Sequence, residues 1–221
     1  MRDSYREQLD DILADLVHMA QVVSAAVRSA TTALLEADLK LAEQVISEDQ
    51  LLDNKQAEIE SRAFSLLARQ APVAGELRTL VATLRMVTEL ERMGDLAAHV
   101  AKIARLRYPE SAVPSSLRPN FVRMADVAEK MVITAGQTLN DRNIQTAQEL
   151  RDRDQEMDDL RRSQFRVLLS DDWSHGVEAA VDVALLGRYY ERIADHAASM
   201  GRRIIYVVTG SFPEPTVWPQ P

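Results

Sequence analysis

Acidic residues spaced four apart are the side chains in this 221-residue chain with the clearest capacity for chemistry. Residues at this spacing share one face of an α-helix, so each pair directs two carboxylates the same way. Two like charges so placed repel by about a few tenths of a kcal/mol, and a bound metal ion would remove that penalty. Four pairs are candidate metal ligands for this reason: Asp49–Asp53, Glu91–Asp95, Asp154–Asp158 and Glu191–Asp195.

Two of these pairs lie in the similar segments ERMGD and ERIAD, where small residues surround the acids. An apolar stripe through Leu77 and Val81 leads to Glu91, and a similar stripe leads to Glu191. A carboxylate on such a stripe is partly desolvated, which is unfavourable unless it is paired or bound to metal. The alternatives are exposed acids on long helices, above all for residues 49–53 and 154–158, and salt bridges to Arg85, Arg92, Arg188 or Arg192.

Carboxylate ligands favour magnesium, manganese or iron, with zinc as a further candidate, and the chain has no cysteine for a thiolate site. His99 and His196 follow the acidic pairs and could join or buffer a site, although a lone histidine on a helix is more often a packed side chain. A ferritin-like di-iron centre would need Glu-x-x-His twice, and no histidine here has glutamate three residues before it. Nucleotide-binding glycine loops and the serine hydrolase motif are also missing.

The positions of the prolines predict the elements that carry these acids. Residues 1–71, 73–108 and 120–212 contain no proline, which in a helix interior costs about 3 kcal/mol. Strong helix formers dominate these blocks and glycine is scarce, so we predict an all-α protein. The expected helices run to about residue 36 and then over about 39–69, 73–107, 119–141, 144–169 and 175–208.

Residues that cap helices mark several of the boundaries. Asp38 and Asn143 are the expected N-caps of the second and fifth helices, and Asp172 or Ser174 that of the sixth. Methionine and aromatic side chains, Phe64 among them, are expected in the core. The segment 108–119 is rich in proline and serine and divides the chain as a linker. We expect the tail, 210–221, to be disordered.

The two halves resemble each other as an internal repeat does. A shift of 105 places Asn143 on Asp38, and a shift of 100 places ERIAD on ERMGD. We therefore predict two tandem three-helix bundles made of six long antiparallel helices, with repeat one at 1–107 and repeat two at 120–209.

Charge and composition limit the partners. The net charge of −8 disfavours binding to nucleic acid. Asp10 and Asp11 stand where a signal peptide would need an apolar run, and no stretch of about 18 uncharged apolar residues predicts a membrane span. Membrane contact is therefore expected to be peripheral, and the absence of cysteine fits a reducing cytoplasm.

The acidic segments carry a resemblance to the PhoU family of phosphate-transport regulators. The resembling stretches are ELERMGDLAAHVA, RYYERIADHAASM, EDQLLDNKQAEIE and DQEMDDLRRSQF, and the similarity extends over about residues 1–209. The resemblance implies two three-helix repeats in a cytoplasmic, non-enzymatic protein that associates peripherally with the membrane through its partners and forms a homodimer.

The function that the resemblance implies is negative regulation of phosphate uptake and of the phosphate-starvation response, the Pho regulon. The protein would be an adaptor between the ATPase of a phosphate ABC importer and a phosphate-sensing histidine kinase. The resemblance also implies multinuclear metal clusters at the eight acids named above. Leu96 stands where repeat two has His196, so we expect tighter metal binding in repeat two. The alternative function is a carboxylate-bridged multinuclear metal enzyme such as a phosphoesterase.

Overall fold

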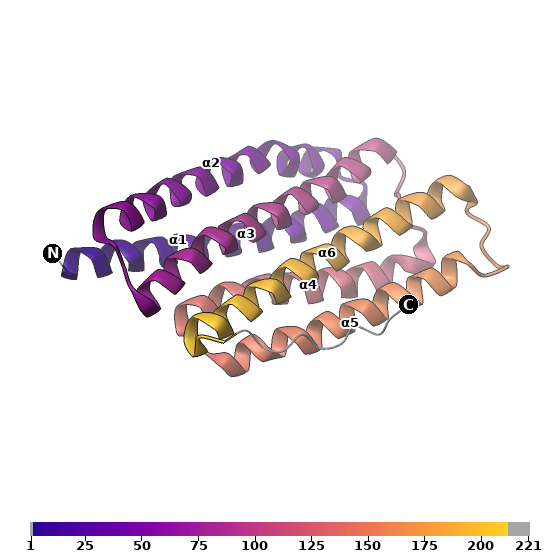
Figure 1. The fold of residues 1–221 in the computed structure, drawn as a ribbon. Helices are drawn as coiled ribbons and strands as arrows, with labels where there is room; N and C mark the ends of the chain where they lie inside the picture. Colours follow the sequence, from indigo (N-terminus) through magenta and orange to yellow (C-terminus); the bar gives the residue numbers. More distant parts are fainter. Residues whose placement is uncertain (1, 212–221) are drawn as a thin grey trace.

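Long helices make up almost all of the computed structural model, which describes residues 2–211. Within this range there is no strand, and the all-α prediction is confirmed (Figure 1). The predicted disorder of the tail concerns residues that lie outside the described range from 212 onward. The elements are α1 (Arg2–Glu36), α2 (Leu39–Gln70), α3 (Ala74–Arg107), a short 3-10 helix (Ser115–Leu117), α4 (Arg118–Asp141), α5 (Ile144–Leu168) and α6 (Gly176–Thr209).

Two of the predicted N-caps are confirmed. The Asp38 carboxylate accepts a hydrogen bond from the Leu41 amide, and Asn143 Oδ1 accepts from the amides of the second and third residues after it. The prediction for α6 is wrong, because this helix begins after His175, which makes no side-chain cap bond. Gly176 has a φ of +81°, and the indole of Trp173 donates to its carbonyl at 2.9 Å, so this turn is held without a capping residue.

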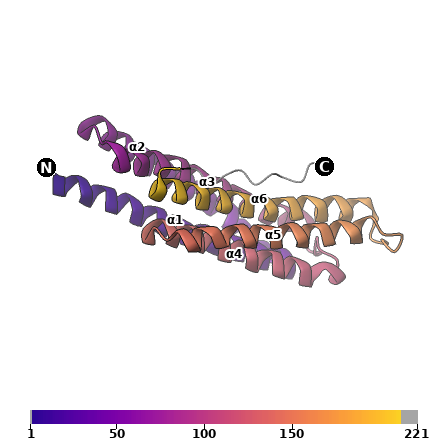
Figure 2. The ribbon, with the colours of Figure 1, turned by 60° about the horizontal axis from the view of Figure 1, so that its bottom comes forward.

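The six helices form two three-helix bundles that share a central ring. In each repeat all three helices pack against one another, and across the repeats α1 packs on α4 and α3 on α6. The ring of α1, α3, α6 and α4 is therefore a four-helix bundle. Helix α2 packs on the outside of this ring against α1 and α3, and helix α5 packs on it against α4 and α6 (Figures 1 and 2). This is the predicted pair of tandem three-helix units.

Helix α1 is one of the four helices of the ring. By length and composition alone it is the one helix in the described range that could cross a membrane. It packs against α2, α3 and α4, and Leu16, Val23 and Leu34 are completely buried. Its place in the bundle accounts for its apolar character.

Three side chains expected on the apolar faces lie at the surface instead. Phe64 is 59% exposed, and Leu77 and Val81 are each 40% exposed. The buried face of α3 is formed by neighbouring positions such as Leu80 and Val87. The stripe that leads to Glu91 thus begins at the edge of the buried face of α3, which explains how the acids that continue it remain accessible.

Polar contacts join the two repeats across the ring. The hydroxyls of Thr31 and Tyr190 lie 2.6 Å apart, and Tyr190 is completely buried. Arg107 donates to the buried carboxylate of Asp182 from two nitrogens. These contacts fix how α6 lies against α1 and α3.

The interior of repeat two also contains a glutamine without hydrogen bonds. Gln164 is fully buried, and neither its Oε1 nor its Nε2 has a partner among the described residues. A Cβ added at Gly187 would lie 1.9 Å from Gln164 Oε1, so the amide fills the space that this glycine leaves. The corresponding residues of repeat one, Ile59 and Val87, are buried and apolar.

We expect Gln164→Met to raise the free energy of unfolding by about 1 kcal/mol, because it removes a buried polar group that has lost its water and gained no partner. Urea denaturation at neutral pH would measure the change. Gln155→Met, at an exposed position of the same helix, is the control and should have little effect. Destabilisation by Gln164→Met would show that the amide is satisfied in solution, for example by a buried water molecule.

Candidate functional site

The four acids of repeat one converge between α2 and α3. The carboxyls of Asp49 and Asp95 lie close enough to act on each other. Burial, together with the charges of Asp95 and Asp53, raises the pKa of Asp49 to about 6. Burial and the same two neighbours also raise the pKa of Glu91. Asp49 and Glu91 are therefore harder to ionise, because they are partly buried and other acids are close.

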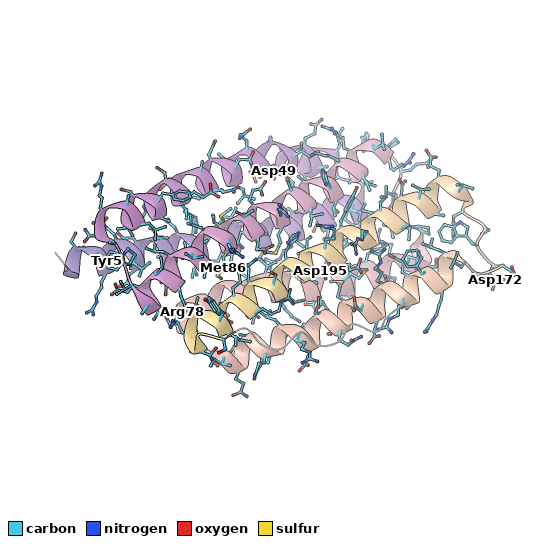
Figure 3. All side chains as sticks on the ribbon, viewed as in Figure 1. Tyr5, Asp49, Arg78, Met86, Asp172 and Asp195 are labelled. Atoms are coloured by element: carbon cyan, nitrogen blue, oxygen red, sulfur yellow. The ribbon has the colours of Figure 1, made fainter. Side chains whose placement is uncertain are left out.

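The acids of repeat two converge in the same way between α5 and α6. Burial raises the pKa of Asp154 to about 7, with further contributions from the charges of Asp195 and Asp158. The pKa values of Asp158 and Asp195 are raised by burial and by the charge of Glu191. Figure 3 labels one member of each cluster, Asp49 on α2 and Asp195 on α6, near the middle of the bundle.

Ion pairs distinguish the two clusters. In repeat two the Glu191 Oε2 atom accepts hydrogen bonds from both Arg161 and Arg188. In repeat one none of the four acids forms an ion pair with any residue from 2 to 211, and the side-chain donor to Asp53 is the neutral amide of Gln50, at 3.1 Å. The salt-bridge alternative for Arg188 is therefore confirmed in repeat two.

Arg161 was missed by the sequence analysis. It follows Asp154 by seven residues, which is two helical turns along the same face, and this spacing could have identified it.

The histidines do not join the acids; they are packed side chains, which is the more frequent role of a lone histidine on a helix. His196 Nδ1 lies 2.6 Å from Glu89 on α3, and the ring of His99 packs against Tyr189 on α6 at 5.4 Å between centroids. Adjacent residues point about 100° apart around a helix, so the neighbour of an acid facing α5 can face α3 instead. The reason for expecting tighter binding in repeat two is therefore lost.

Glu89 is the centre of a partly buried polar network between α3 and α6. Ser199 donates to it at 3.1 Å and Arg203 at 3.2 Å, in addition to the contact with His196. Burial opposes the ionisation of Glu89, but the hydrogen bonds from His196 and Arg203 outweigh this effect and lower its pKa to about 2. The network links the inner helices that carry the two acidic clusters.

A small apolar cavity adjoins the repeat-one cluster. It has a volume of about 170 Å³ and is lined by side chains of α1 and α2, including Val22 and Val45, and by Asp49 and Gly94. A Cβ at Gly94 would lie 2.3 Å from Leu52 Cδ1, so the glycine lets α2 approach α3 closely. The small residue beside the acids therefore permits close packing of α2 on α3.

The donor atoms fit a hard cation better in repeat one than in repeat two. Within residues 2–211 no three acidic or histidine side chains form a preassembled ligand set, so a cation would have to draw the carboxylates together. In repeat one Asp49, Asp53, Glu91 and Asp95 supply oxygen atoms, and among residues 2–211 no guanidinium forms an ion pair with them, although the charge of Arg92 acts on Glu91 from further away. In repeat two, by contrast, the guanidinium groups of Arg161 and Arg188 already contact Glu191.

The fold and these clusters define a class of protein: a helical bundle of two repeats in which each outer helix faces an inner helix through paired acids. The PhoU domain matches residues 16–104 and again residues 121–204. The chain belongs to the PhoU family.

Relatives and a solved structure agree with this assignment. The chain is 46% identical over 214 residues to the phosphate-specific transport system accessory protein PhoU homolog 1 of Mycobacterium leprae, which covers 97% of this chain and 96% of that protein. It is 47% identical over 213 residues to PhoU homolog 2 of Mycobacterium tuberculosis, covering 96% and 100%. The crystal structure of PhoU from Pseudomonas aeruginosa matches with a TM-score of 0.87 at 27% identity, over 94% of this chain and all of that one.

Proposed function

We propose that this protein is a cytoplasmic negative regulator of phosphate uptake and of the phosphate-starvation response. It would act without turnover, as an adaptor between the ATPase of a phosphate ABC importer and a sensor histidine kinase. The observation that supports this most strongly is similarity over nearly the whole chain to proteins named as accessory to the phosphate-specific transport system.

Exposed apolar side chains offer surfaces for such partners. Val177, Val181 and Leu185 are spaced four apart along α6 and are 81%, 51% and 42% exposed. Leu77 and Val81 occupy the equivalent positions on α3. Apolar side chains exposed in a row are typical of surfaces that bind another protein, including a second copy of the chain in a homodimer.

The acidic clusters support a second part of the proposal, the binding of magnesium, manganese, iron or zinc ions. The cluster of Asp49, Asp53, Glu91 and Asp95 fits such an ion best, because its negative charge is not neutralised by an ion pair. A phosphoesterase would also need a general acid or base beside the ions. The histidines of α3 and α6 lie at the interface between the repeats instead, which favours a regulatory rather than a catalytic role.

Deletion of the gene is expected to leave the phosphate-starvation response active in phosphate-rich medium, because the kinase would lose its repressing partner. A starvation-promoter reporter would measure this, and a plasmid copy should restore repression. Mycobacterium tuberculosis has two PhoU homologs, so any second copy in the host is deleted as well. A response that stays repressed in that strain would refute the proposal.

A surface variant sharpens the same experiment. Val177→Lys with Val181→Lys should fail to restore repression, whereas Val122→Lys, on α4 and 53% exposed, should restore it. Melting temperatures of the purified variants would show that both are folded. Activity of the cation-loaded protein on a phosphate monoester would favour the enzyme instead.

A further inference from the structure

Corresponding positions in the two repeats carry different side chains around the acids. Arg161 and Arg188 of repeat two correspond to Gln56 and Thr88 of repeat one under the shifts of 105 and 100. Gln56 donates to Glu60 at 2.9 Å, and Thr88 donates to the Leu84 carbonyl of its own helix. Neither contacts the repeat-one acids, so the difference between the repeats is built into two pairs of residues.

The two arginines are placed as resident cations. Both guanidinium groups contact the same oxygen of Glu191, from α5 and from α6, and the Arg188 contact is 2.5 Å long. The side chains of Arg161 and Glu191 are each only 18% exposed, so water screens this pair weakly. Arg161 also lies over the ring of Phe165 at 5.0 Å, which holds its guanidinium in place.

Other basic residues near the clusters do not produce the difference. Lys102 corresponds to Arg202 and Arg92 to Arg192, so each repeat has the same more distant positive charges. Arg162 is specific to repeat two, and its ion pair is with Asp159, outside the cluster. Its charge also acts on Asp158, but it forms no ion pair with any of the four acids.

We propose that Arg161 and Arg188 replace external metal ions in repeat two, so that only the acids of repeat one bind a cation. A metal ion at Glu191 would have to displace two guanidinium groups and leave each without its carboxylate partner. The two acidic sites of this chain are therefore unequal, one dependent on external ions and one neutralised by the protein itself. This inference rests on the proposed cation binding.

The test exchanges the residues that differ. The full-length protein is stripped with chelator and titrated with Mn²⁺, and bound metal is measured by calorimetry and elemental analysis. Asp49→Asn with Asp95→Asn should abolish binding, whereas Asp154→Asn with Asp195→Asn should leave it unchanged. Equal losses in these two variants would overturn the proposal while leaving cation binding itself intact.

Substitution of the arginines should create a second site. Arg161→Gln with Arg188→Thr is expected to add Mn²⁺ binding that Asp154→Asn and Asp195→Asn remove. The reverse change, Gln56→Arg with Thr88→Arg, should weaken the repeat-one site by about tenfold or more. Arg166→Gln, at an exposed position of α5, is the matched control and should change neither site. No additional binding after removal of both arginines would contradict the proposal.

Melting temperatures keep the inference testable if the wild-type protein binds no Mn²⁺, a result that would refute the proposed cation binding. Without metal, Arg161→Gln with Arg188→Thr should lower the melting temperature, because four carboxylates then face one another, and Mn²⁺ should restore it. A variant that is neither destabilised nor responsive to Mn²⁺ would overturn the role of the arginines.

Discussion

Glu89→Gln is expected to lower the free energy of unfolding at pH 7 by about 3 kcal/mol, because removal of one partner leaves buried donors and charge uncompensated. The Glu89 side chain is 14% exposed and receives contacts from His196, Ser199 and Arg203. All three partners come from α6, so the substitution weakens the contact between the repeats. Chemical denaturation would measure the loss.

The same substitution has a predictable pH dependence. The pKa of Glu89 is about 2 in the folded protein, below its ordinary value of 4.5. The stabilisation is therefore present above about pH 4.5 and is lost as the pH falls through about 2. Wild type and Glu89→Gln should become similar in stability at low pH. Glu43→Gln, at an exposed site on α2, is the control. A comparable loss of stability in that variant would refute the role assigned to Glu89 in joining the two repeats.

The chelated protein should become less stable as the pH rises from about 5 to about 8. Asp49 and Asp154 have folded pKa values of about 6 and about 7, both above the ordinary 3.8. A raised pKa means that the folded state holds the proton more tightly, so this stabilisation is present at low pH and is lost as the pH passes these values. Melting temperatures in chelator would record the fall.

Two variants and the addition of Mn²⁺ test whether these carboxylates cause the loss of stability. Asp154→Asn should reduce the fall above about pH 6, whereas Asp152→Asn, at an exposed site on the same helix, should not. Mn²⁺ added at pH 8 should restore stability through the repeat-one acids, because an ion that binds only the folded state stabilises it. A melting temperature that stays constant or rises over this range would show that the carboxylates are not coupled as described.

Local signals in the sequence were sufficient to predict the elements. Pro72 and the caps Asp38 and Asn143 mark where helices end and begin, and these effects act within a few residues along the chain. The approach of the acids within each repeat also followed from local spacing, because two same-face pairs on neighbouring helices face each other.

Features that depend on how helices are covered could not be predicted in this way. Phe64 and Leu77 belong to apolar stripes, but a stripe does not show which of its edges another helix will cover. His196 follows an acid in sequence, yet its bond to Glu89 depends on how α6 packs on α3. The contact of Arg161 with Glu191 likewise forms only after α5 and α6 have packed.

The central ring is built from contacts between equivalent helices of the two repeats. Helix α1 meets α4, its own equivalent, and α3 meets α6, its own equivalent. Contacts between identical elements across a two-fold axis are those of an isologous interface, so a chain with a single repeat could close the same ring by pairing with a second copy. In such a symmetric ancestor every contact would occur twice. Fusion into one polypeptide removes that constraint, and it allows Glu89 to face His196 and Ser199 while the equivalent position, Tyr189, packs on His99.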